Sequence, residues 1–143
     1  MGKQLTYRIK SRIDSIYPVE QAILNEAALA GFNEDACFSL RLAIDEAVVN
    51  AIIHGNGQQE TKQIHITAAF DESKVAITVR DEGEGFDQSR LADPRQDPYL
   101  HKTHGRGVFL IRQFTSEVFF NEKGNEITFI VDQSAPANLA QLA

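Results

Sequence analysis

One stretch that is apolar around almost its whole circumference constrains this chain more than any other. It reads LRLAIDEAVVNAIIHGN over residues 40–56, and in its apolar centre only Asp45, Glu46 and Asn50 are polar. A helix that is apolar nearly all round is a buried helix. Glu46 and Asn50 are four residues apart and therefore lie on one face. Buried polar groups need a ligand, a metal or a hydrogen-bonding partner. The helix alone leaves two alternatives open, a binding site on this face or a hydrogen-bonded pair in the core.

Composition sets the class of protein. The chain has 143 residues, 43% of them apolar and 24% charged, which is typical of one soluble globular domain. A net charge of -6 argues against nucleic acid as the main partner. The single cysteine excludes an internal disulfide, and no apolar run reaches the length of a membrane span. We therefore expect a cytoplasmic protein with no membrane partner, a single domain over residues 1–133 and a loose C-terminal tail over residues 134–143.

Periodicity predicts the secondary structure. Apolar and polar residues alternate over residues 4–10, 64–70, 75–79, 118–120 and 127–131, which indicates five strands, the first of them at an edge. Pro18 suits the first position of a helix that Gly31 ends, and Asn33 is a good N-cap for the long central helix, which Gly55 ends. A third helix follows residue 107. This order predicts an α+β fold, a two-layer sandwich with three helices on one face of a mostly antiparallel sheet.

A glycine-rich motif follows the third predicted strand. Asp81, Gly83, Gly85 and Phe86 form D-x-G-x-G-F. Glycines at this spacing let the backbone turn sharply and approach a flat ligand closely, and the acid could accept a hydrogen bond from a ligand amine. The alternative is a simple turn in which the aspartate caps a neighbouring backbone amide.

A second glycine-rich motif opens the third predicted helix. Gly105, Arg106 and Gly107 would present free amides and a positive dipole end, which suit a di- or triphosphate, although a flexible helix entry would also explain them. Lys102 and His104 add positive charge to an acidic protein, which favours an anionic ligand. The segment over residues 88–104 before the motif has no clear periodicity and is expected to be a lid.

Taken together, these motifs resemble the GHKL superfamily of ATPases and kinases, in the order in which that superfamily carries them. The segments DEAVVNAIIHGN and GRGVFLIRQF are most similar to the branch of anti-sigma factor serine/threonine kinases. No pair of dimerisation helices with a phosphoacceptor histidine precedes the motifs, which argues against the histidine kinase branch. The resemblance implies the Bergerat-type ATP-binding fold, with ATP and Mg²⁺ as cofactors.

The resemblance also implies roles at the phosphate end. Asn50 matches the asparagine that holds Mg²⁺, whose preference for oxygen ligands an amide can meet. Glu46 matches the acid that orients or deprotonates the attacking hydroxyl. Gly105 and Gly107 match the glycines on the phosphate side. Arg106 is one of the cations that would replace the basic residue common before the first of these glycines, where this chain has a threonine.

At the base end, the resemblance matches Asp81 to the acid that accepts from the adenine amino group. Gly83, Gly85 and Phe86 would shape the base pocket around it. The branch commonly carries a threonine after the glycine of the last hairpin, where it helps to bind the adenine side. Here that position is Asn125, so the chain departs from the branch at this contact.

The function implied is that of an ATP-binding anti-sigma regulatory factor with serine/threonine kinase activity toward a small antagonist protein. The resemblance implies a sigma factor and its antagonist as partners, and a homodimer as the assembly. The alternative is a non-catalytic, nucleotide-binding switch module that binds protein partners. A fragment of a sensor histidine kinase is a third reading, and it would need a phosphoacceptor domain on another chain.

The remaining polar residues have structural expectations. His54 is expected to cap the end of the central helix, and Cys37 to pack in its first turns. Asp45 is expected to pair with an arginine, for which Arg41 lies one turn earlier. The histidines lack ligand spacing, so no zinc site is expected.

Overall fold

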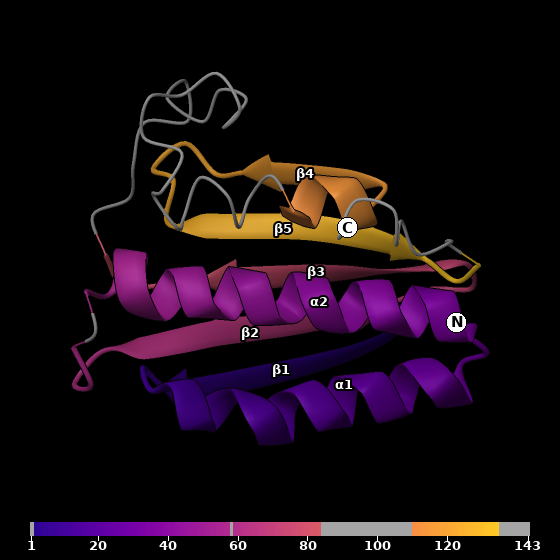
Figure 1. Cartoon of the computed structure of the whole chain (residues 1–143), viewed down its shortest axis with the longest axis horizontal. Coiled ribbons are helices and arrows are strands. Elements are labelled where there is room, and N and C mark those ends of the chain that lie inside the picture. The colour runs from indigo at the N-terminus through magenta and orange to yellow at the C-terminus, as the bar shows by residue number, and fades with distance from the viewer. Residues whose placement is uncertain (1, 58, 84–109, 135–143) are drawn as a thin grey trace.

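Five antiparallel strands form one layer of the molecule and helices form the other (Figure 1). The computed structural model describes residues 2–57, 59–83 and 110–134. Its elements, in order, are β1 (Lys3–Lys10), the 3-10 helix η1 (Ile13–Ser15), α1 (Ile16–Leu29), α2 (Glu34–Asn50), the π-helix η2 (Ala51–Gly55), β2 (Gln63–Phe70), β3 (Lys74–Arg80), β4 (Glu117–Phe120) and β5 (Glu126–Asp132). Residues 110–114, before β4, are also helical.

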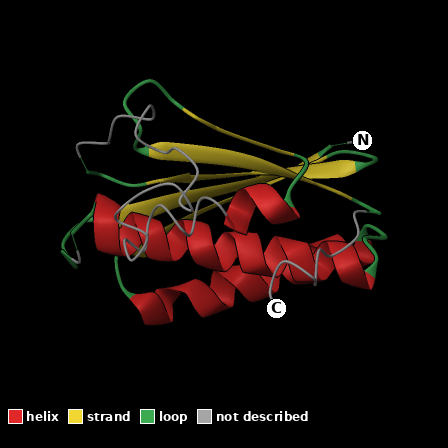
Figure 2. Ribbon diagram, turned by 45° about the horizontal axis from the view of Figure 1, so that its top comes forward, coloured by secondary structure: helices red, strands yellow, loops and turns green. Residues whose placement is uncertain are grey.

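The sheet confirms the five predicted strands. Its strands lie in the order β1-β2-β3-β5-β4, so β1 is an edge strand as expected. All four neighbouring pairs are antiparallel. Alternate residues of the inner strands are buried because one face of the sheet packs on the helices (Figure 2). The predicted α+β class, with helices on one face of an antiparallel sheet, is therefore confirmed.

Helix α1 follows its predicted face but begins earlier than expected. Val19, Ile23 and Ala27 are buried, as their spacing predicts. The helix begins at Ile16, so Pro18 is its third residue and not its first. The first-turn amides of a helix have no partner within it, and proline is therefore tolerated there. Gly31 adopts a φ of 93° just after the helix, which confirms it as the stop.

Helix α2 is the central buried helix. Asn33 Oδ1 accepts a hydrogen bond of 2.7 Å from the backbone amide of Ala36, which confirms the predicted N-cap. Leu40, Ile44 and Val48 are fully buried, and the helix packs on α1, β3 and β5. The α geometry ends at Asn50, and the five residues Ala51–Gly55 form a π-helix in place of the regular helix expected there.

Several predicted features lie outside the described residues. These are Gly85, Phe86, the lid over residues 88–104, Gly105, Arg106, Gly107 and all of the tail but Ser134. Within the described ranges, no helix is both long enough and apolar enough to cross a membrane.

A buried acid in α1 corrects the prediction for Arg41. The Arg41 guanidinium lies against Glu20, with 3.4 Å between Arg41 Nε and Glu20 Oε1, and not against Asp45. Glu20 is only 3% exposed. Burial is the largest cause of a raised pKa at Glu20, and the Asp45 carboxyl adds to it through a hydrogen bond and its charge. Together, against the opposing charge of Arg41, they bring the pKa of Glu20 to about 8. The sequence missed this contact because Glu20 lies on another helix.

Glu20 should make the protein less stable as the pH rises. An unfolded glutamate loses its proton near pH 4.5, whereas the folded carboxyl keeps it up to about pH 8. Between these values the folded state binds more protons than the unfolded state, so the free energy of unfolding falls as the pH increases. Glu20→Gln removes this titration and should flatten the dependence, as measured by urea midpoints from pH 5 to pH 8.5. Parallel profiles for wild type and variant would contradict the assignment.

Candidate functional site

Asn50, at the end of α2, carries an unpaired polar atom. Its Oδ1 is buried and has no hydrogen-bond partner among the described residues. Leaving a buried acceptor unpaired costs about 1–3 kcal/mol, so such an atom calls for an explanation, such as a ligand or an ion. The core-pair alternative left open by the sequence therefore does not account for this oxygen. An amide oxygen suits the preference of Mg²⁺ for oxygen ligands.

Glu46, one turn before Asn50, is a half-buried acid. Burial raises the pKa of the Glu46 carboxyl, and the charge of neighbouring Asp45 raises it further. A carboxylate with a raised pKa is a stronger base than an ordinary glutamate. The face of α2 thus combines a proton acceptor with an unpaired oxygen.

The turn after β3 packs against the end of η2. A side chain at Gly83 would collide with the backbone carbonyl of Gly55, and a side chain at Gly55 would collide with the carboxyl group of Asp81. Both positions therefore need glycine, because backbone and carboxyl approach too closely for a Cβ atom. This contact holds Asp81 at the end of the helix that carries Asn50.

Asp81 accepts one hydrogen bond within its own turn. The Gly83 amide donates to Oδ1 at 2.8 Å, so the capping alternative is correct for this oxygen. The other oxygen receives no hydrogen bond from the described part of the chain. Burial raises the pKa of Asp81, and the Gly83 hydrogen bond and the charges of Lys62 and Lys123 oppose the rise. Asp81 can therefore cap the turn and still accept from a ligand.

Asn56, which the sequence did not identify, joins the elements around the site. It is 1% exposed. Its Oδ1 accepts from the Glu82 amide at 2.8 Å, while its Nδ2 donates to Ser11 Oγ at 3.2 Å and to the Gln63 carbonyl at 3.1 Å. One side chain thus ties the turn after β3 to the ends of β1 and β2. The only signal in the sequence was a polar residue directly after the helix-ending glycine.

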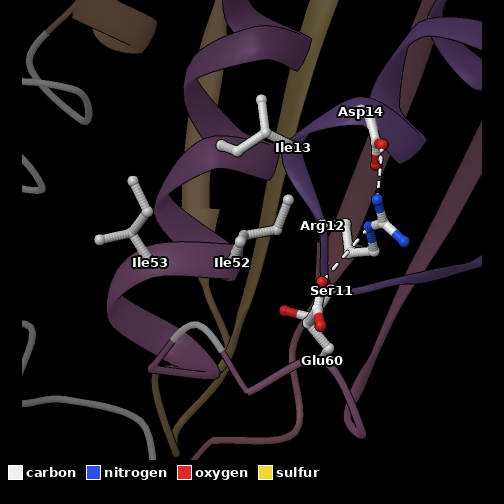
Figure 3. Close-up of a pocket in the computed structure, with 7 residues that line it drawn as sticks. All are labelled: Ser11, Arg12, Ile13, Asp14, Ile52, Ile53 and Glu60. Atoms are coloured by element: carbon white, nitrogen blue, oxygen red, sulfur yellow. Dashed lines mark hydrogen bonds and ion pairs between the residues drawn. The ribbon is translucent and has the colours of Figure 1, made fainter.

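A groove of about 630 Å³ lies beside η2 (Figure 3). Its lining residues are Ser11, Arg12, Ile13, Asp14, Ile52, Ile53 and Glu60. Arg12 spans its polar side, with 2.9 Å between a terminal guanidinium nitrogen and Asp14 Oδ2 and 3.3 Å between Nε and Glu60 Oε1. None of the described residues predicted to bind nucleotide lines this groove.

Comparison with known families agrees with this arrangement. A family model described as a histidine kinase-like ATPase domain matches residues 9–131, which include Glu46, Asn50 and the D-x-G-x-G-F motif. The chain belongs to the histidine kinase-like ATPase family. The match covers all the described elements except the first part of β1 and the end of β5.

Individual relatives of this histidine kinase-like ATPase carry related names. It is 27% identical over 99 residues to a serine-protein kinase RsbW of Oceanobacillus iheyensis, covering 65% of this chain and 63% of the relative. It is 34% identical over 88 residues to an anti-sigma F factor of Halalkalibacterium halodurans, covering 59% of each chain. The match thus spans about 60% of the length of these two curated relatives.

A third relative matches over more of its length. The anti-sigma F factor of Heyndrickxia coagulans is 30% identical over 132 residues, covering 89% of this chain and 87% of the relative. A solved structure of the RsbU and RsbW domains of a Mycobacterium tuberculosis protein shares the fold, with a TM-score of 0.62 at 21% identity over 94% of this chain and 34% of the other. The resemblance to the anti-sigma kinase branch is therefore confirmed.

The contact between the two turns predicts that Gly83→Ala destabilises the protein. The new methyl group would meet the Gly55 carbonyl, and overpacking of this kind costs about 1–3 kcal/mol. Thermal unfolding measures the loss. Gly57→Asn is the matched control, because a Cβ there meets nothing within 4 Å and asparagine tolerates its φ of 60°. Equal melting temperatures for both variants would contradict the close approach.

Proposed function

We propose that this protein is an ATP-binding anti-sigma regulatory factor that transfers the γ-phosphate of ATP to a serine or threonine of a small antagonist protein. The strongest support is the unpaired, buried Oδ1 of Asn50, one turn after an acid with a raised pKa. Membership of the histidine kinase-like ATPase family and the names of the relatives support the same activity.

At the phosphate end, Asn50 would hold Mg²⁺ through its amide oxygen. The ion, when bound, would neutralise charge on the phosphate oxygens. Glu46 would accept the proton of the attacking hydroxyl group, and its raised pKa brings its basicity closer to neutral pH. By resemblance, Gly105, Arg106 and Gly107 would complete the phosphate side.

At the base end, Asp81 would accept a hydrogen bond from the adenine amino group. Gly83 would support it, as its amide already holds the other carboxylate oxygen. Gly85 and Phe86 would shape the pocket, as the resemblance implies. Phosphoryl transfer needs mainly positioning and charge stabilisation, so a rigid acid at the base end contributes by fixing the nucleotide.

The proposed partners are a sigma factor and its antagonist protein, as in an anti-sigma factor of the partner-switching kind. The function as an anti-sigma factor implies a cytoplasmic protein, and a homodimer is proposed from the resemblance. We propose that residues 1–133 form a single ATP-binding domain, followed by a loose tail over residues 134–143.

Nucleotide specificity tests the role of Asp81. Adenine presents an amine to the carboxylate, whereas guanine presents a carbonyl that it would repel. Wild type should therefore bind ATP more tightly than GTP, and Asp81→Asn should lose about 1–3 kcal/mol of ATP binding. Calorimetric titration with both nucleotides measures this. Equal affinity of the wild type for ATP and GTP would remove Asp81 from the base pocket.

Substitutions on α2 separate metal binding from chemistry. Asn50→Ala should weaken Mg²⁺-dependent nucleotide binding and abolish transfer without lowering the melting temperature, because Oδ1 has no described partner to lose. Glu46→Gln should leave ATP affinity nearly unchanged and reduce turnover roughly 10²–10⁴-fold. Glu34→Gln, in the exposed first turn of the same helix, is the matched control.

The measurements are ATP affinity, melting temperature and transfer of radioactive phosphate to candidate antagonist proteins. Normal transfer by Glu46→Gln would end its proposed role as base. A lower melting temperature for both α2 variants, with transfer intact, would indicate a structural pair. Tight ATP binding by the wild type with no transfer to any antagonist would instead support the non-catalytic switch module.

A further inference from the structure

The turn between β4 and β5 is held by one side chain. Asn121 Oδ1 accepts from three successive backbone amides, those of Gly124, Asn125 and Glu126, at 2.8, 3.1 and 3.3 Å. Gly124 takes a φ of 81°, a conformation that glycine adopts without strain. This turn therefore presents the residue after Gly124 in a fixed backbone position.

The same asparagine orients the side chain of Asn125. Asn121 Nδ2 donates to Asn125 Oδ1 at 2.7 Å. Because the oxygen of the Asn125 amide is engaged by this donor, its nitrogen is left to bond in another direction. That nitrogen, Nδ2, donates to the backbone carbonyl of Asp81 at 3.2 Å.

Asn125 thus bonds both backbone polar atoms of Asp81. Besides the side-chain bond, the Asp81 amide donates to the Asn125 carbonyl at 2.9 Å. These bonds lie one residue beyond the paired ends of β3 and β5, where Arg80 faces Glu126. They extend the rigidity of the sheet to the residue that carries the carboxyl group.

The peptide unit after Asp81 is held from two sides. Its carbonyl oxygen accepts from Asn125 Nδ2, and its amide, which belongs to Glu82, donates to Asn56 Oδ1 at 2.8 Å. Two side-chain amides from separate parts of the chain therefore fix one peptide plane. Rotation of this plane would turn the Asp81 side chain, so its direction depends on both amides.

We infer that Asn125 is a positioning residue for base recognition, acting on the nucleotide through the backbone of Asp81. It occupies the position where the anti-sigma kinase branch commonly has threonine. In this chain the residue at that position acts by hydrogen bonding to the backbone of Asp81. This inference rests on the proposed function, in which Asp81 accepts from adenine.

Nucleotide titrations test this role. Asn125→Ala should weaken the binding of ATP, ADP and AMP by the same factor, about 3- to 10-fold. The reason is that the bonds from Asn125 to Asp81 act at the adenine end, which the three nucleotides share. The preference for ATP over GTP should shrink. KM for ATP should rise while kcat stays constant, since Glu46 and Asn50 lie on another element. Asn125→Asp keeps the size and the acceptor for Asn121 but turns an acceptor toward the Asp81 carbonyl, so it should bind ATP no better than Asn125→Ala.

Asn33→Ala is the matched control for a general loss of stability. It removes a hydrogen bond of similar kind, the N-cap of α2, at the end of the helix opposite to the Gly55 end that approaches Asp81. It should lower the melting temperature and leave all nucleotide affinities unchanged. If Asn125→Ala fails to fold, the nucleotide affinities of Asn125→Asp are compared with those of Asn33→Ala instead.

Three outcomes would overturn the inference, and they are distinguishable. If the wild type binds ATP but both Asn125 variants match Asn33→Ala in affinity and in ATP/GTP preference, Asn125 has no role in recognition. If the wild type binds no ATP, both the proposed function and this inference fail. A loss of affinity that grows from AMP to ATP would place the effect of Asn125 at the phosphate end and would also contradict its role at Asp81.

Discussion

The close approach of Gly83 to the Gly55 carbonyl is the constraint on which the rest of the candidate site depends. It brings the end of a sheet strand and the end of the central helix into direct contact. Neither residue tolerates a side chain, because the space is filled by backbone and by the Asp81 carboxyl. The proposed base-recognising acid and the proposed metal ligand belong to different layers of the fold, and this contact fixes one relative to the other.

Much of the fold follows from the sequence because its signals are local. Strand alternation and the Asn33 cap depend on neighbours a few residues away, and both are confirmed. The shared face of Glu46 and Asn50 likewise follows from helical spacing. The π-helix, the several bonds of Asn56 and the pairing of Arg41 with Glu20 were not predicted. Each depends on a contact or a backbone geometry that helical and strand periodicity does not encode.

Asp81 shows why two readings of a motif need not exclude each other. The sequence posed a choice between a ligand-binding acid and a turn-capping one. One carboxylate oxygen caps the Gly83 amide, and no described residue donates to the other. The cap fixes the direction of the group, which is what a binding residue needs. Lys62 and Lys123 act against the effect of burial and favour the ionised, accepting form, in a chain of net negative charge.

Glu20 and Glu46 show that a raised pKa does not by itself mark a functional acid. Burial is the leading cause of the raised pKa at both residues, and Asp45 adds to it at both. Glu20, however, has a guanidinium beside it and lies almost fully buried in α1, although its Oε2 has no hydrogen-bond partner among the described residues. Glu46 is half-buried and shares a helical face with an oxygen that lacks a described partner. Neither a raised pKa nor an unpaired oxygen separates the two acids, because Oε2 of Glu20 is also unpaired among the described residues. The difference is that Glu46 is only half-buried, whereas Glu20 is enclosed beside Arg41.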